Sequence, residues 1–244
     1  MSQPGSPRGL DLGATIEPMD AAMGKSHHVR AYYLTEASFA LASIALRRMK
    51  IARYLDSNDP FELLGADRSD PLQRRLLELS RTRSHEQYGM LCFSRGWHDP
   101  VLWSHYADRH RGICLGFDVA RHLLSTIKYI KTPIPPVPLK GHNPTPREAT
   151  DFFGLLLRVK SEGWRYEREI RASVRLDPKT AEGGLYFMPF SPHLRLRQVF
   201  LGARCTLPLD AVRELAIRTD SSVEVFQTRL AFRSFRVVKN RRST

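Results

Sequence analysis

Apolar residues recur with two different periods along this chain, and the order of these periods predicts its elements. Short runs of strand character cover residues 29–33, 90–94, 112–118, 170–176, 196–201 and, as one or two strands, 223–238. Helical spacing covers residues 35–54, 71–85, 101–108, 148–160 and 208–217. The elements follow no regular β-α-β period and no internal repeat. We therefore expect one α+β domain, with a mixed, mainly antiparallel sheet flanked by helices.

Two segments carry no such period. Residues 1–26 are rich in Gly, Pro and Ser, which predicts a disordered leader before a single domain over residues 27–244. Residues 127–147 contain six prolines, and proline fixes φ and lacks an amide donor. This stretch is therefore predicted to be an extended loop on the surface.

The charge balance narrows the choice of partners. Lys and Arg number 38 against 25 Asp and Glu, a formal net charge of +13. Such a surface suits nucleic acid, an acidic protein or an anionic nucleotide, and equally a solvated basic exterior. No apolar run approaches the roughly 18 residues that cross a bilayer, and the first residues lack the apolar core of a signal peptide. We expect a cytoplasmic protein with no membrane partner.

The cysteines and histidines do not predict a metal site. Cys92, Cys114 and Cys205 are widely spaced and lie in apolar stretches, which is typical of reduced core residues. His105 and His110 are the nearest histidine pair, but at helical spacing they point in different directions. Structural zinc sites are built from closely spaced pairs, so we expect none.

Three clusters concentrate side chains that carry chemistry. Residues 58–62 (NDPFE) form a turn in which Phe61 is expected to be the anchor, and a well-capped loop is the favoured interpretation. Residues 91–94 (LCFS) place Ser94 at a strand end. Trp103, His105 and Tyr106 follow nearby; at helical spacing Trp103 and Tyr106 suit a core, but their concentration favours a pocket wall.

The third cluster is Tyr166, Glu167, Arg168 and Glu169, directly before a strand. In a strand, Glu167, Glu169 and Arg171 share one face. Because two carboxylates and a guanidinium are costly to bury, the spacing slightly favours an exposed, salt-bridged edge. In a cleft, one Glu would instead act as acid, base or electrostatic stabiliser while Arg171 holds it or an anion.

The order of these motifs resembles a known bacterial family. NDPFE, LCFS, LWSHYAD, GICLGFD, K-x₃-W-x-YE-x-E-x-R and VFLG follow one another from about His28 to Val238. This succession is similar to the DUF2971 family, a domain of unknown function. That family carries no established activity, so the resemblance predicts one domain and no particular reaction.

A second resemblance is to the ADP-ribosyltransferase fold, including DarT-type enzymes that modify nucleic acid. In that fold a basic residue near the first strand, a Ser or Tyr on a middle strand and a late Glu bind NAD and stabilise the reacting ribose. The resemblance implies that Glu169 or Glu167 is catalytic. It implies NAD-binding roles for His28, Arg30, Ser94, Trp103, His105, Tyr106, Tyr166 and Arg171.

The sequence is compatible with three functions. The leading hypothesis is an NAD-dependent ADP-ribosyltransferase-like enzyme, a glycosyltransferase acting on a nucleic-acid or protein acceptor as a toxin, effector or anti-phage protein. The second is a non-catalytic nucleic-acid-binding protein that uses basic residues near the C-terminus, namely Arg229, Arg233, Arg236, Lys239, Arg241 and Arg242. A metal-dependent nuclease ranks lowest, because Asp177-Pro178-Lys179 puts a proline where a strand residue belongs.

Overall fold

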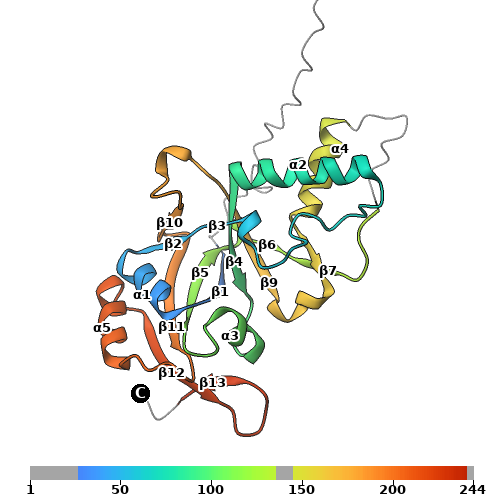
Figure 1. Cartoon of the computed structure of the whole chain (residues 1–244). Helices are drawn as coiled ribbons and strands as arrows, with labels where there is room; N and C mark the ends of the chain where they lie inside the picture. Colours follow the sequence, from blue (N-terminus) through green and yellow to red (C-terminus); the bar gives the residue numbers. More distant parts are fainter. Residues whose placement is uncertain (1–26, 136–144, 241–244) are drawn as a thin grey trace, which may run out of the picture.

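The computed structural model describes residues 27–135 and 145–240 (Figure 1). The predicted leader, residues 136–144 of the proline-rich loop, Arg241 and Arg242 lie outside the described residues. The strands are β1 (His28–Thr35), β2 (Arg48–Lys50), β3 (Ala52–Arg53), β4 (Tyr88–Ser94), β5 (Ile113–Ala120), β6 (Ser125–Thr126), β7 (Lys128–Ile130), β8 (Val159–Ser161), β9 (Glu169–Arg175), β10 (Phe187–Pro189), β11 (Leu194–Leu201), β12 (Glu224–Leu230) and β13 (Val237–Lys239). The helices are α1 (Ala37–Ala45), α2 (Pro71–Gln87), α3 (Pro100–Tyr106), α4 (Pro146–Leu156) and α5 (Leu209–Thr219).

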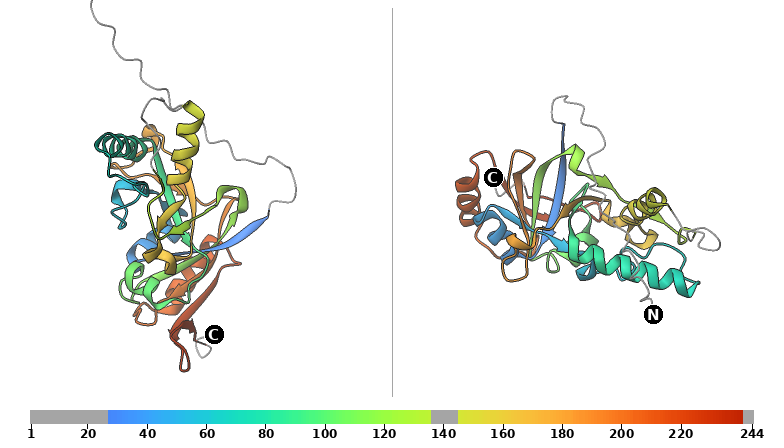
Figure 2. Two further views of the ribbon diagram at one scale, coloured as in Figure 1. Left: turned by 90° about the vertical axis from the view of Figure 1, so that its right-hand side faces the viewer. Right: turned by 90° about the horizontal axis from the view of Figure 1, so that it is seen from above.

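Within these residues, one large sheet organises the molecule. Its strand order is β13-β12-β11-β5-β1-β4-β9-β6, with β3 added against β4. The β11 and β12 pair is parallel, because α5 carries the chain back between them, and the other pairs are antiparallel. The sheet curls, as the two turned views show (Figure 2). The predicted α+β domain with a mixed, mainly antiparallel sheet is confirmed.

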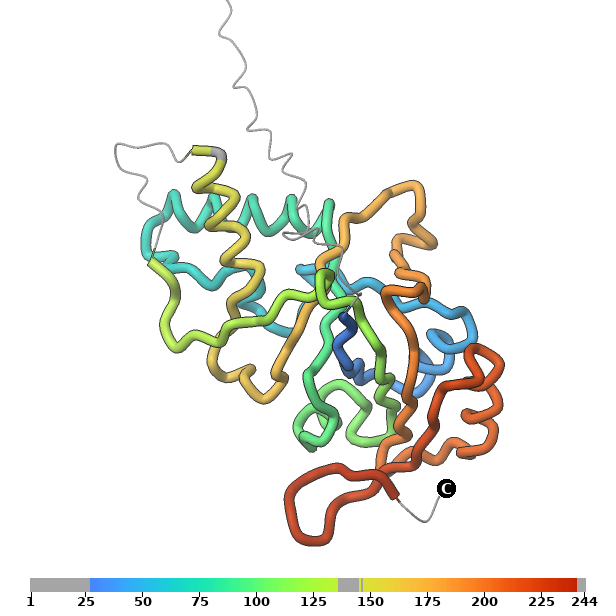
Figure 3. Tube along the Cα trace, turned by 180° about the vertical axis from the view of Figure 1, so that it is seen from behind, coloured from blue at the N-terminus to red at the C-terminus, as the bar shows by residue number. Residues whose placement is uncertain are grey.

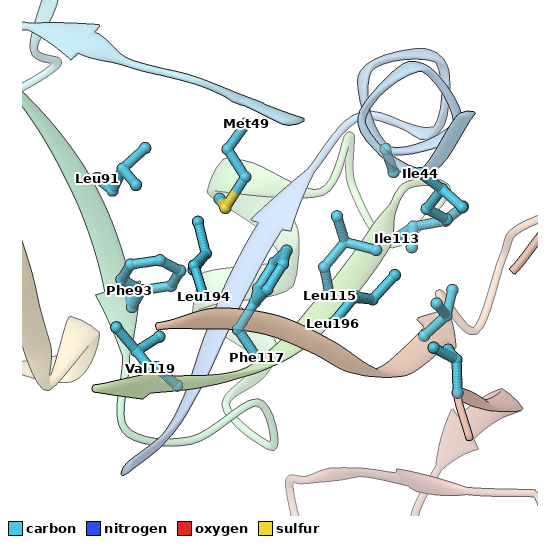
Figure 4. Packing of buried hydrophobic residues seen from close by; sticks show 14 of the residues in the cluster. Ile44, Met49, Leu91, Phe93, Ile113, Leu115, Phe117, Val119, Leu194 and Leu196 are labelled. Atoms are coloured by element: carbon cyan, nitrogen blue, oxygen red, sulfur yellow. The ribbon is translucent and has the colours of Figure 1, made fainter. Parts of the chain in front are cut away.

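One face of this sheet, here called the core face, carries the main hydrophobic core. Successive strand residues point to opposite faces, so alternate positions of β4, β5 and β11 supply it. Phe93, Phe117 and Leu196 lie among these positions, below α1 and Met49 (Figure 4). Burial of each such side chain contributes about 1.5–3 kcal/mol. Because these positions face the core, the residues between them point to the opposite face of the sheet.

The opposite face, here called the polar face, is covered at its two ends. Trp103 and Leu102 of α3 pack there against Leu34 and Phe200. Beyond β4, Tyr54 and Leu63 pack with Met90 and Leu157 in a separate cluster. Helices α2 and α4 lie against each other outside that cluster (Figure 1). Between the two covers, half-buried polar side chains of β1, β5 and β11 lie on the sheet.

Two helix predictions were wrong in extent. The helix predicted over residues 35–54 ends at Ala45, and after Arg47, at φ 53°, the chain forms β2 against β10. The helix predicted over 148–160 ends at Leu156, so Lys160 belongs to strand β8. After α1 the apolar spacing continues because Met49 of β2 packs into the same core as Ile44. After α4 it continues because Val159 of β8 is also buried.

Candidate functional site

A line of five charged side chains is buried between the polar face and the segments that cover it. Arg171 donates to Glu62 at 2.6 and 3.1 Å and to Glu169 at 2.8 Å. Lys160 Nζ lies 3.3 Å from Glu169 and 2.6 Å from Glu167. None of the five is more than 7% exposed. We call this line, from Glu62 to Glu167, the charge chain.

Four separate segments build the charge chain. Glu169 and Arg171 are alternate residues of β9 and therefore share the polar face, as predicted. Glu167 ends the 3-10 segment Glu162–Glu167, and Arg168 follows at φ 47°. Glu167 and Glu169 consequently do not share a strand face; their carboxylates meet because both reach Lys160. The prediction of an exposed salt-bridged edge was wrong, since both glutamates are at most 5% exposed.

The NDPFE turn supplies the far end of the charge chain. Asp59 accepts the backbone amide of Phe61 at 2.9 Å, which closes the turn and directs Glu62 inward. Asp59 and Glu62 are both buried. Phe61 was expected to anchor the turn, but it is 53% exposed, so the anchor is the ion pair of Glu62 with Arg171.

Helix α3 meets the other end of the charge chain. The Tyr106 hydroxyl donates to Glu167 and accepts from Asn58 at 2.9 Å. One residue earlier, His105 Nδ1 lies 2.8 Å from the Tyr166 hydroxyl. These contacts tie α3 to segment 162–167 and close the region over the charge chain.

The charges of this region determine where a proton resides. Three carboxylates face two cations, so one negative charge is in excess. Burial raises the pKa of Glu167 above its ordinary value, against the opposing influence of Lys160. Burial also acts to raise the pKa of Glu169, but Arg171 and Lys160 outweigh it and lower that pKa. Glu167 is therefore the first of the two to take up a proton, and Glu169 remains ionised.

A row of paired residues crosses the polar face perpendicular to the strands. The successive Cα partners are Glu224, Gln198, Gly116, Tyr32, Ser94 and Glu169, on β12, β11, β5, β1, β4 and β9. Directly paired residues point to the same side of a sheet. At Gly116 a Cβ atom would lie 3.1 Å from Gln198 and 3.3 Å from Tyr32, so glycine permits this close approach. We call this the transverse row.

Arginines lie beside the transverse row on the same face. Arg30 donates to Asp118 at 2.7 Å, and Arg197 donates to the other oxygen of Asp118 at 3.1 Å. Arg195 Nη2 lies 3.3 Å from His28 Nε2. The Nε of Arg195 is buried without a hydrogen-bond partner. Arg197 also lies 3.7 Å from Asp220, so two carboxylates face three guanidinium groups and one positive charge is in excess.

The structure brings some of the sequence-predicted residues together and separates others. Ser94 is paired with Glu169 across β4 and β9, and its hydroxyl accepts the amide of Gly96 at 3.2 Å. Tyr106 joins the same region through Glu167. Trp103 is fully buried and donates to the carbonyl of Trp97, so it packs as core. Arg30 and His28 precede Tyr32 on β1, by two and four residues, and therefore lie on the same face of the strand.

Sequence reasoning missed three contributors to the site. Lys160 was assigned to a helix, although it is the first residue of the K-x₃-W motif, which was its available signal. Glu62 was interpreted as part of a loop. The hydroxyl of Tyr129 accepts the amide of Glu169 at 2.7 Å, and no motif pointed to it. These residues come from distant parts of the chain, so only the fold unites them.

A cavity of about 260 Å³ lies on the core face, away from the charge chain. Leu91 and Phe93 of β4 and Ala172 and Val174 of β9 line it, and these alternate with the residues of the polar face. Its lining is predominantly apolar. It therefore belongs to the hydrophobic layer and not to the site built around Glu169.

The described residues hold neither a cluster of metal-ligating side chains nor a helix able to span a membrane. They contain no group of three or more His, Cys, Asp or Glu placed to hold a metal ion. Asp177 and Lys179, the only pair resembling a nuclease motif, lie in an exposed turn. Among the helices of residues 27–135 and 145–240, none combines the length and apolar character needed to cross a membrane.

Comparison with protein-family models, with curated proteins and with solved structures gives no match for this chain.

Proposed function

We propose that the protein is an NAD-dependent ADP-ribosyltransferase-like enzyme of the DUF2971 type. One observation supports this more than any other: Tyr32, Ser94 and Glu169 are direct Cα partners on the three neighbouring strands β1, β4 and β9. Arg30 extends from the same face of β1. A basic first strand, a Ser-ended middle strand and a late Glu are the arrangement that the resemblance to this fold implies.

The proposed reaction breaks the bond between the nicotinamide nitrogen and C1′ of its ribose. The electron pair leaves with nicotinamide, and positive charge develops on the ribose. A nucleophilic oxygen or nitrogen of the acceptor then bonds to C1′ and gives its proton to a carboxylate or to water. Ionised Glu169, fixed beside the ribose, would stabilise the positive transition state electrostatically. Arg30 is suited to the pyrophosphate, because guanidinium binds phosphate oxygens in a bidentate manner.

This proposal requires a movement. Glu169 is only 4% exposed, and α3 and segment 162–167 lie over the charge chain. NAD therefore reaches Glu169 only if these two covers separate, which breaks the contacts of Tyr106 with Glu167 and of His105 with Tyr166. Neither contact involves Arg171, so separation leaves the ion pairs of Arg171 with Glu62 and Glu169 in place.

Release of nicotinamide from NAD tests the proposal. We expect the wild-type chain to release nicotinamide, and Glu169→Gln to lower kcat by at least about 100-fold, the usual cost of removing one electrostatic stabiliser. Glu62→Gln is the matched control. It removes one carboxylate from Arg171 in the same buried chain but at the end away from Ser94, and we expect it to retain activity within about 10-fold.

The acceptor is assayed with labelled NAD and, in parallel, single-stranded DNA, RNA and protein mixtures. A toxin, effector or anti-phage role would then follow from the acceptor that becomes labelled. Saturating NAD binding without nicotinamide release would contradict the proposal. Equal losses in Glu169→Gln and Glu62→Gln would assign Glu169 a structural role instead.

A further inference from the structure

The hairpin formed by β12 and β13 ends in a loop with unusual chemistry. Phe232 and Phe235 are 89% and 98% exposed, the highest values among the large hydrophobic residues of the described chain. Leu230, at the end of β12, is also exposed. The loop projects beyond the sheet at the lower end of the molecule (Figure 3). We call residues 229–239 the basic hairpin.

The basic hairpin is an ordered element. Ala231 donates to the carbonyl of Arg236 at 2.9 Å and closes the loop. Val237 is fully buried in the cluster with Trp97, and its amide donates to the carbonyl of His98 at 2.8 Å. The exposed rings therefore extend from a fixed base, and folding of this chain does not explain why they face solvent.

The charge of the basic hairpin is entirely of one sign. Residues 227–240 contain no Asp or Glu, and they carry Arg229, Arg233, Arg236 and Lys239. The guanidinium of Arg229 lies 4.4 Å from the centroid of the Phe232 ring. Lys239 lies 3.4 Å from the centroid of Phe226, whose ring stacks on Phe200 at 5.4 Å. Cations and aromatic rings thus alternate from the tip to the base.

We propose that the basic hairpin binds single-stranded nucleic acid. Unpaired bases present π-faces that stack on exposed aromatic rings, and the adjacent phosphates pair with cations. A second copy of this chain is disfavoured, because two hairpins of this charge repel each other. An anionic bilayer is a poorer fit, because the sequence F-R-S-F-R places arginines directly beside both rings and leaves no continuous apolar tip to insert. This site is independent of the proposed transferase reaction.

The test uses the full chain and a fluorescein-labelled oligothymidine of about 12 nucleotides, followed by anisotropy. We expect Phe232→Ala with Phe235→Ala to weaken binding by at least about 25-fold, about 5-fold for each lost stacking contact. Both rings are exposed, so the double variant is expected to fold like the wild type. Phe39→Ala, which removes another exposed ring, on α1, is the control and should change affinity by less than about 2-fold.

Salt dependence separates the contribution of the cations. Four neutralised phosphates predict a slope of about −3 in log affinity against log salt. Replacing Arg229, Arg233 and Arg236 by Gln should reduce that slope by about 2, whereas Gln at Arg147, Arg213 and Arg218, which removes the same charge from α4 and α5, should leave it nearly unchanged.

Unchanged oligothymidine affinity in the double phenylalanine variant would overturn the proposal. So would tighter binding of the wild type to phosphatidylserine vesicles than to the oligonucleotide, with loss of vesicle binding in that variant. Glu169→Gln should bind the oligonucleotide like the wild type. Oligonucleotide binding without nicotinamide release would therefore refute only the transferase proposal. Nicotinamide release without oligonucleotide binding would refute only the proposal that the basic hairpin binds nucleic acid.

Discussion

Among single residues, Arg171 is a buried cation that pairs with two buried carboxylates. It is the direct counterion of Glu62 and Glu169, and all three side chains are almost completely buried. Removing one partner of a buried ion pair leaves an uncompensated charge in a medium that solvates it poorly. We therefore expect that removal of a cation from the charge chain lowers the stability of the fold more than any other change in it.

Arg171→Met is expected to lower the free energy of unfolding by about 3–5 kcal/mol, measured by urea denaturation at neutral pH. The control is Arg175→Met, the same substitution at an exposed position four residues further along β9. It should lower the free energy of unfolding by less than about 0.5 kcal/mol. Similar losses in the two variants would show that the guanidinium of Arg171 is not a required counterion.

Glu169 gives stability a defined pH dependence. Its pKa is lower in the folded chain than its ordinary value of 4.5, so the unfolded state binds more protons in acid. Its contribution is fully present above about pH 4.5 and is lost as the pH falls through the folded pKa. The stability difference between wild type and Glu169→Gln should accordingly be largest at neutral pH and narrow in acid. A constant difference from pH 7 to pH 3 would contradict this assignment.

Glu167 is expected to behave in the opposite sense. Its pKa is raised by burial, so its protonated form favours the folded state. The contribution of Glu167 is present in acid and is lost as the pH rises from 4.5 through the folded pKa. Relative to wild type, Glu167→Gln should therefore gain stability as the pH rises over this range, measured by urea denaturation at each pH. A relative loss of stability would mean that Glu167 is bound as a carboxylate.

At the scale of elements, the close approach of the loop after α3 to β1 depends on one small residue. A Cβ on Gly112 would lie 2.2 Å from the carbonyl oxygen of Thr35 and 2.9 Å from the backbone of Ala107. The backbone of Thr35 is held in the sheet, and that of Ala107 by its hydrogen bond to Trp103 of α3, so neither can move away from an added Cβ. Gly112 thus sets how α3, and with it Tyr106, lies over the polar face.

Gly112→Ala is expected to lower the unfolding free energy by more than about 2 kcal/mol and to weaken the contact of Tyr106 with Glu167. Gly163→Ala is the matched control, because a Cβ there meets nothing within 4 Å. Thermal unfolding measures the stability of the two variants. A Gly112→Ala protein as stable as the Gly163→Ala protein would show that the loop has more freedom than the packing indicates.

Element types were largely predictable from the sequence, and their ends were not. The strand that ends at Ser94 and the helix that begins at Pro71 follow from local periodicity. Lys160 was assigned to a helix because its neighbours keep an apolar spacing. Period-two alternation predicted that Glu169 and Arg171 share a face, but it does not reveal which face is buried.

At the scale of the whole molecule, the net charge of +13 is distributed over distinct surfaces. On the polar face, Arg30, Arg195 and Arg197 outnumber the carboxylates of the adjacent ion pairs, whereas the basic hairpin has no acidic residue at all. The first surface suits the pyrophosphate of a bound nucleotide, and the second a flexible polyanion. Composition left an anionic partner and a solvated basic exterior equally open. Only the fold distinguishes two separate positive surfaces.

The proposed transferase reaction requires the nicotinamide ribose to react beside Glu169. The most direct test is a crystal structure of the Glu169→Gln protein with intact NAD. We expect C1′ of this ribose to lie against Ser94 and the side chain at position 169, the pyrophosphate to contact Arg30, and α3 and segment 162–167 to have separated. NAD bound away from the transverse row, or no NAD at saturating concentration, would contradict it.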